Sequence, residues 1–119
     1  TSLETKGGAD EIVVRDFYGY SLMVSTDLGS DLIVMEDVAT WEDLGVFTGP
    51  DADAVTMTRV DSGKNITVSL DVGNDSLIGT NVTAAYDVVL EGGDGFDTIG
   101  DFGIFGGEKT EIKEFENYL

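Results

Sequence analysis

Aspartate is the residue type whose number and spacing could support chemistry in this chain of 119 residues. The chain has 24 Asp and Glu residues against 6 Lys and Arg residues, and it has no Cys and no His. Thiol chemistry is therefore excluded, as are the commonest catalytic base and metal ligand. The net charge of −18 argues against nucleic acids and anionic membrane surfaces as partners, because both need a basic face. No apolar segment approaches the roughly 18 residues of a membrane span, so we expect no membrane insertion.

Five aspartates recur at a nearly constant interval. Each belongs to a short motif, such as Gly-Ser-Asp-Leu-Ile at residues 29–33, with an aliphatic residue two positions after the Asp. The intervals are 21, 22, 22 and 22 residues, and the positions are Asp10, Asp31, Asp53, Asp75 and Asp97. Seven positions after each Asp comes another apolar residue, from Phe17 in the first repeat to Ile104 in the last. Unrelated loops would not keep this phase, so the chain consists of repeats of about 22 residues.

The repeat predicts the fold class. Within each repeat, two short runs alternate apolar and polar residues with period two, separated by Gly, Asp and Asn, which indicates strands and turns. Such a unit cannot bury its apolar face alone, but stacked units form a parallel β-solenoid, here of about five coils. The aliphatic residues expected to stack are Ile12, Ile33, Val55, Leu77 and Ile99 on one wall, and Leu22, Leu44, Ile66 and Val88 on another. The rival fold, an antiparallel β-sandwich, gives no reason for the returning Asp.

The solenoid is expected to span residues 1–105, and residues 106–119 break the pattern. Ile112, Phe115 and Leu119 fall at helical spacing in this tail. We expect a short amphipathic helix or a last strand that caps the open end, because an open end exposes unpaired backbone groups. The alternative is a docking segment that inserts into the next molecule.

One turn carries a more specific motif. Residues 92–100 read Gly-Gly-Asp-Gly-Phe-Asp-Thr-Ile-Gly, which fits the nonapeptide G-G-x-G-x-D-x-U-x at every position. This segment resembles the calcium-binding repeat of the RTX, or haemolysin-type, family, and residues 72–77 resemble a degenerate copy. The resemblance implies Ca²⁺ as a cofactor, with Asp97, Asp94 and Asp75 as the first ligands and Asp53, Asp31 and Asp10 as further ones. RTX repeats follow each other every nine residues, whereas the period here is 22.

Residues 7–105 as a whole resemble the longer Gly/Asp-rich tandem repeats of large bacterial surface proteins. This resemblance implies a secreted or cell-surface protein. We therefore expect a non-catalytic structural module that associates with itself end to end, as a subunit of a filament, surface layer or adhesin. The alternative function is an RTX-like calcium-binding β-roll module of a secreted protein.

Stacked aspartates need a physical account in either case. Adjacent coils put like residues about 5 Å apart, where two carboxylates repel by roughly 3 kcal/mol at an effective dielectric of 20. Three arrangements would relieve this repulsion. Each Asp could accept backbone N–H bonds in its own turn, bound Ca²⁺ could neutralise the column, or the carboxylates could be exposed and screened by salt.

Two further features of the sequence bear on function. Carboxylate pairs are too plentiful in this chain to indicate a glycosidase, and Arg15 and Arg59 are the only arginines, so no enzyme activity is expected. Tyr18, Tyr20, Trp41 and Tyr86 could form a face on which carbohydrate stacks. The competing interpretation is an aromatic ladder that packs between neighbouring coils, with Trp41, Tyr20 and Tyr86 at roughly corresponding places.

Overall fold

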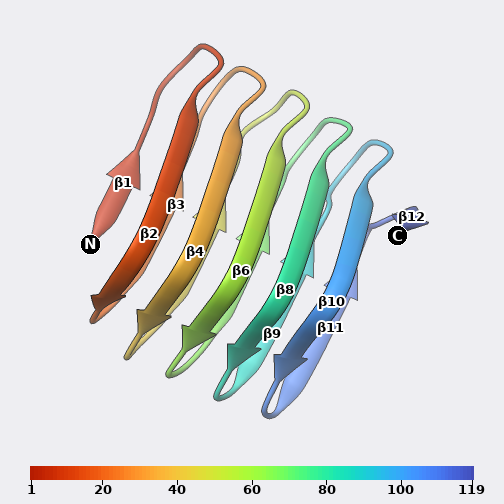
Figure 1. Ribbon diagram of the computed structural model, residues 1–119. Helices are drawn as coiled ribbons and strands as arrows, with labels where there is room; N and C mark the ends of the chain where they lie inside the picture. Colours follow the sequence, from red (N-terminus) through yellow and green to blue (C-terminus); the bar gives the residue numbers. More distant parts are fainter.

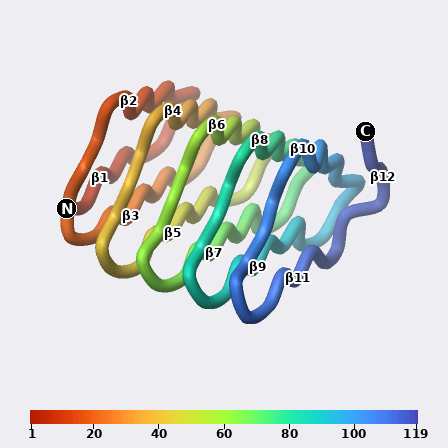
Figure 2. The backbone as a smooth tube through the Cα atoms, turned by 60° about the horizontal axis from the view of Figure 1, so that its bottom comes forward, coloured from red at the N-terminus to blue at the C-terminus, as the bar shows by residue number.

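The chain winds into a stack of flattened coils that follow one another along a single axis, each made of one long and one short strand (Figures 1 and 2). The computed structural model describes all residues from Thr1 to Leu119. It contains twelve strands in two six-stranded sheets, and every pair of neighbouring strands is parallel. The predicted all-β parallel solenoid of about five coils is therefore confirmed. Because the chain contains only strands, it has no helix that could span a membrane.

Successive strands alternate between the two sheets along the chain. The first sheet holds the short strands β1 (Ser2–Glu4), β3 (Leu22–Ser25), β5 (Leu44–Phe47), β7 (Ile66–Ser69), β9 (Asp87–Glu91) and β11 (Lys109–Lys113). The second holds the long strands β2 (Glu11–Gly19), β4 (Leu32–Thr40), β6 (Ala54–Ser62), β8 (Ser76–Ala84) and β10 (Thr98–Gly106), followed by the short β12 (Asn117–Tyr118).

The core is a set of aliphatic columns that run along the solenoid. The strand register stacks Ile12, Ile33, Val55, Leu77 and Ile99 in one column, and Leu22, Leu44, Ile66 and Val88 in another, as the repeat predicted. These nine side chains belong to one hydrophobic cluster of 23 buried residues. Each coil thus adds its apolar side chains to one core that it shares with its neighbours, which is the usual source of stability in a solenoid.

Every long strand contains one residue with a positive φ, and the parallel pairing skips it. With strict alternation, the side chain seven residues after each recurring Asp would point outward, but the left-handed residue shifts the alternation by one position. In the second coil, Ile33, Met35 and Val38 therefore all point into the core. The left-handed residues are Asp16 (φ 52°), Asp37 (54°), Arg59 (53°), Asn81 (54°) and Gly103 (102°).

Arg59 is the one member of this column whose residue type does not suit the conformation. Asp, Asn and Gly adopt left-handed backbone with little strain, whereas Arg does not. Replacing Arg59→Asn should therefore raise the melting temperature by about 2 to 5 °C. The lost ion pair with Asp37 is exposed at both ends and should cost less than the strain it accompanies. Scanning calorimetry checks the prediction, with Arg15→Asn as control, because Arg15 also pairs with an exposed carboxylate but lies outside the left-handed column. A drop in melting temperature as large as that of the control would contradict it.

The tail does not form the helix allowed by its spacing. Lys109–Lys113 instead forms β11, which pairs with β9 over five residues and turns Ile112 toward the interior behind Leu90. Pairing with the free edge of β9 satisfies the backbone groups of this segment and extends an aliphatic column, and both gains outweigh a weak helical pattern. The last-strand alternative is therefore the correct one.

Candidate functional site

The five recurring aspartates form a continuous ladder at the corner where each coil enters its long strand. We call Asp10, Asp31, Asp53, Asp75 and Asp97 the aspartate ladder. In each step, one carboxylate oxygen, Oδ1, accepts the backbone N–H of the ladder residue in the preceding coil, over 2.7 to 2.8 Å. The bond thus joins two coils. One of the three arrangements expected from the sequence had each Asp accept N–H bonds within its own turn. The structure corrects this, because each carboxylate accepts from the neighbouring turn, 21 or 22 residues away.

The ladder ends at a residue that the repeat did not predict. The backbone N–H of Asp97 donates to Oε1 of Glu116 over 2.8 Å, so Glu116 occupies the next ladder position. Its spacing of 19 residues and its different residue type hid it from the repeat. The signal was nevertheless present, because Phe-Glu-Asn-Tyr at 115–118 matches Phe-Asp-Thr-Ile at 96–99 in position and polarity.

The second oxygen of each ladder carboxylate has no partner. Oδ2 is buried and unbonded in all five residues. The last four residues of the ladder, from Asp31 to Asp97, are each no more than 3% exposed. The same corner holds a facing column from the end of each short strand, which the backbone bonds align as Thr5, Thr26, Thr48, Leu70 and Gly92. A Cβ on Gly92 would lie 2.9 Å from Oδ2 of Asp97, so the orphan oxygen points at this column.

Burial changes the acidity of the ladder. Loss of hydration is the main cause, and it raises the pKa of Asp53 to about 6 and that of Asp75 to about 7. The backbone N–H of the preceding coil acts in the opposite direction, and neighbouring carboxylates add to the rise. The Thr48 hydroxyl lies beside Asp53 and also lowers the pKa there, whereas the Asp75 carboxyl faces a column position occupied by Leu70. The pKa of Asp97 is raised as well, again chiefly by burial.

The predicted calcium ligands do not come together as a binding site. Ca²⁺ takes six to eight oxygen ligands, usually from several carboxylates and carbonyl groups around one centre. No group of three or more acidic side chains in the structure could hold a metal ion. Asp94 is exposed, while Asp97 and Asp75 are buried, and the Oδ1 atom of each already accepts a hydrogen bond from a backbone N–H. As arranged, these residues do not fit a calcium ion, and calcium binding stays a prediction of the resemblance.

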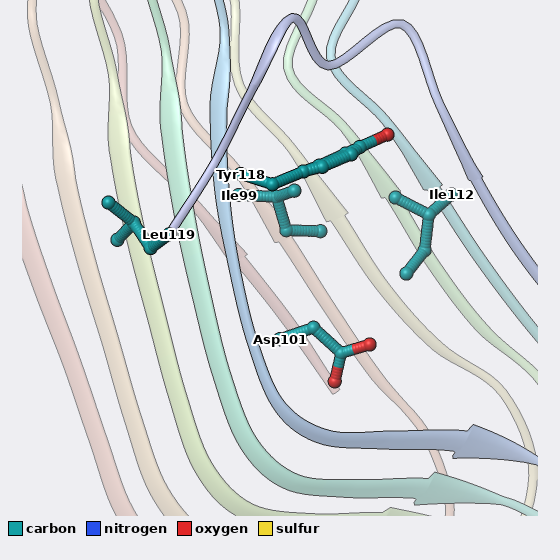
Figure 3. A pocket seen from close by; sticks show the side chains of 5 residues that line it. All are labelled: Ile99, Asp101, Ile112, Tyr118 and Leu119. Atoms are coloured by element: carbon teal, nitrogen blue, oxygen red, sulfur yellow. The ribbon is translucent and has the colours of Figure 1, made fainter.

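The three predicted cap residues lie at or near the C-terminal end of the solenoid but differ in burial. Phe115 is buried, Ile112 is half-buried, and Leu119 is exposed. Ile112 and Leu119 line a hollow of about 190 Å³ together with Ile99, Asp101 and Tyr118. Figure 3 shows the Tyr118 side chain next to Ile99, with Ile112 and Leu119 on either side and the Asp101 carboxylate opposite Tyr118. The last coil is therefore only partly closed.

Both sheets keep an unpaired edge at each end of the stack. β1 and β2 are outermost at one end, and β11 and β12 at the other. β12 pairs only with Thr98 and Ile99, so most of β10 also keeps a free edge. Unpaired parallel edges are templates for a further strand.

No protein family, curated protein or solved structure matches this chain.

Proposed function

We propose that this chain is a non-catalytic structural module, secreted or at a cell surface, that associates end to end with further copies of itself. The observation that supports the proposal most is the fit between the two ends. The same parallel register would continue from the last coil of one copy into the first coil of the next. A contact between two different surfaces can repeat indefinitely and so build a filament.

Continuation of the register pairs chemically matched residues in the short-strand sheet. Leu3 and Ile112 are the two terminal members of one inward column, which runs through Val24, Val46, Val68 and Leu90. Neither is fully buried within one copy. If β1 of a second copy extends this sheet beyond β11, its Leu3 lies on Ile112 and covers part of the hollow. Burial of these two side chains would favour association.

The next column along the same strands adds charge complementarity. Glu4 begins this column, and Lys113 ends it after Glu91. In the stacked pair, Glu4 of one copy therefore faces Lys113 of the other. In the long-strand sheet, Tyr118 would meet Ile12 in the same way, since both belong to the column of Ile33 and Ile99. Lysines on an edge strand can also protect it from pairing, so the experiment has to separate the two roles.

A charge exchange tests the interface. Lys113→Glu alone and Glu4→Lys alone should each shift the protein toward monomer, because each brings like charges together at the contact. An equal mixture of the two variants should assemble again, since every contact in an alternating stack then joins opposite charges. Sedimentation velocity and negative-stain microscopy measure this, at about 0.15 and 0.5 M NaCl, because copies of charge −18 repel one another when salt is low.

The control is Lys64→Glu, which makes the same charge change on a middle coil and should leave assembly unchanged. Each sample is measured with CaCl₂ and with EDTA. Assembly in both supports the proposal, whereas a monomer whose melting temperature rises with Ca²⁺ supports the RTX-like alternative. A monomer that is indifferent to Ca²⁺ contradicts both functions.

A further inference from the structure

Three large aromatic side chains lie almost fully in solvent on neighbouring coils. Tyr18 is 75% exposed, Tyr20 is 70% exposed and Trp41 is 79% exposed. They stand at the ends of β2 and β4 and in the turns that follow. Exposed aromatic surface that is clustered in this way usually marks a place of binding.

The exposure contradicts an aromatic ladder between coils. The backbone bond from Trp41 N–H to the Gly19 carbonyl puts Trp41 beside Tyr20 on the adjacent coil. Side chains packed on each other as a ladder would bury much of their area, yet both remain at least 70% exposed. Tyr86 is not part of such a column either, because Ala85 is the residue aligned with Trp41 through Gly63. The Tyr20 hydroxyl donates to Glu42 Oε1 over 3.1 Å, but the ring faces of Tyr20 and Trp41 stay exposed and can contact another molecule.

A groove of about 520 Å³ runs beside the rings of Tyr18 and Trp41. Its lining comes from three successive coils and consists of Tyr18, Gly19, Ala39, Thr40, Trp41, Asp61 and Gly63. Ala39 separates Tyr18 from Asp61 in the strand register, so the two positions lie two coil spacings apart, or about 10 Å. This length suits a short stretch of two sugar rings, with small residues as the floor and aromatic rings as the walls.

The polar groups of the groove limit the chemistry of its ligand. Asp61 accepts a hydrogen bond from Thr83 Oγ1 at Oδ1, over 2.8 Å, and its other oxygen forms no bond within the protein. None of the lining residues is cationic. An anionic ligand would also be repelled by the net charge of −18. The groove therefore combines flat π faces with a hydrogen-bond acceptor and disfavours anions.

We propose that this groove binds an uncharged polysaccharide. The apolar C–H faces of its sugar rings would stack on Tyr18 and Trp41, and ring hydroxyls would donate to Asp61. A β-1,4-linked pyranose chain suits the site, because its equatorial substituents leave both ring faces open to stacking. The groove lies on the side of the solenoid and not on its ends, so this binding is independent of end-to-end association. An assembled filament would repeat the site at every subunit.

Trp41 makes the test direct, because it is the only tryptophan in the chain. Cellohexaose or chitohexaose should shift the tryptophan emission to the blue and protect it from quenching by acrylamide. Tyr18→Ala and Asp61→Asn should each weaken the binding about tenfold in the same titration. Trp41→Ala should abolish heat release in isothermal titration calorimetry. Circular dichroism establishes that each variant is folded.

Phe105→Ala is the matched control. Phe105 is 63% exposed and belongs to the same outward column as Tyr18 and Asp61, but it lies outside the groove. Its loss should leave the affinity for both hexasaccharides unchanged. The proposal is overturned if neither sugar changes the emission up to about 5 mM. A dissociation constant of that size would correspond to a binding free energy of only about 3 kcal/mol. Loss of self-association in Tyr18→Ala, without any sugar binding by the wild type, would overturn it in favour of a protein contact.

Discussion

Lowering the pH from about 8 to about 5 should make this protein more stable, in contrast to the usual effect of acid on a protein held by ionised carboxylates. Asp75 and Asp53 have folded pKa values of about 7 and about 6, both above the ordinary 3.8. Above pH 7 the folded protein holds buried, ionised carboxylates, which oppose folding. As the pH falls through 7 and 6, the folded state takes up protons that the unfolded state still lacks, so stability rises. Below about pH 4 both states are protonated, and the gain is complete.

Asp75→Asn isolates the largest contribution. A pKa difference of one corresponds to about 1.4 kcal/mol, and after allowance for water near the surface of so thin a solenoid we expect about 2 kcal/mol of stabilisation at pH 8. The Asn oxygen can still accept the N–H of Asp53, and the charge is gone. Urea denaturation followed by circular dichroism at pH 8 and pH 5 should show a large difference from wild type at pH 8 and a small one at pH 5.

Asp16→Asn is the matched control, because Asp16 is exposed and Asn tolerates its left-handed backbone. It should change stability little at either pH. Ion pairs oppose the trend only at low pH, since Lys64 and Arg59 hold the pKa values of Glu42 and Asp37 below their usual range. A wild type that loses stability steadily from pH 8 to pH 5 would show that the ladder is ionised and compensated by something else, such as a bound cation.

Gly73→Ala should cost at least about 3 kcal/mol and leave little folded protein at 37 °C. Gly73 lies two residues before Asp75, in a turn with φ of 144°, and a Cβ there would lie 2.2 Å from the Asp51 carbonyl oxygen. The methyl group would strain the backbone and also push two coils apart. The aspartate ladder crosses the same corner, so its bonds to Asp75 would be disturbed as well. Thermal unfolding measures the loss.

Gly7→Ala provides the comparison, because a Cβ at Gly7 would meet only the Leu28 side chain, at 4.0 Å. That variant should be as stable as wild type or slightly more stable, since alanine restricts the unfolded chain. If both glycine variants lose the same small amount of stability, close packing of the coils at the ladder corner is not what requires glycine at position 73.

The spacing of the aspartates was enough to predict the solenoid and the columns of its core, because stacking of equal coils is the only common way to bury so short a repeat. It was not enough to predict what the carboxylates do. Whether the Asp31 carboxylate bonds its own turn or the preceding coil depends on the path of the chain at the corner, which residue types do not reveal. Glu116 was missed because the last repeat is three residues shorter. The choice between a helix and a last strand at residues 109–113 stayed open, because edge pairing with β9 outweighs helical spacing only once the coils are stacked.

All bonds of the aspartate ladder point the same way, from the N–H of one coil to the carboxylate of the following coil. The molecule therefore has a polarity that its repetitive sequence hides. Removal of a coil from the N-terminal end deletes a donor and leaves a carboxylate oxygen that can accept a hydrogen bond from water. Removal of one from the C-terminal end deletes an acceptor and leaves a ladder N–H at the new end of the stack, where it has to find another acceptor or water. A stack shortened by whole coils therefore keeps two chemically different corners, a free carboxylate acceptor at its N-terminal end and a free N–H donor at its C-terminal end.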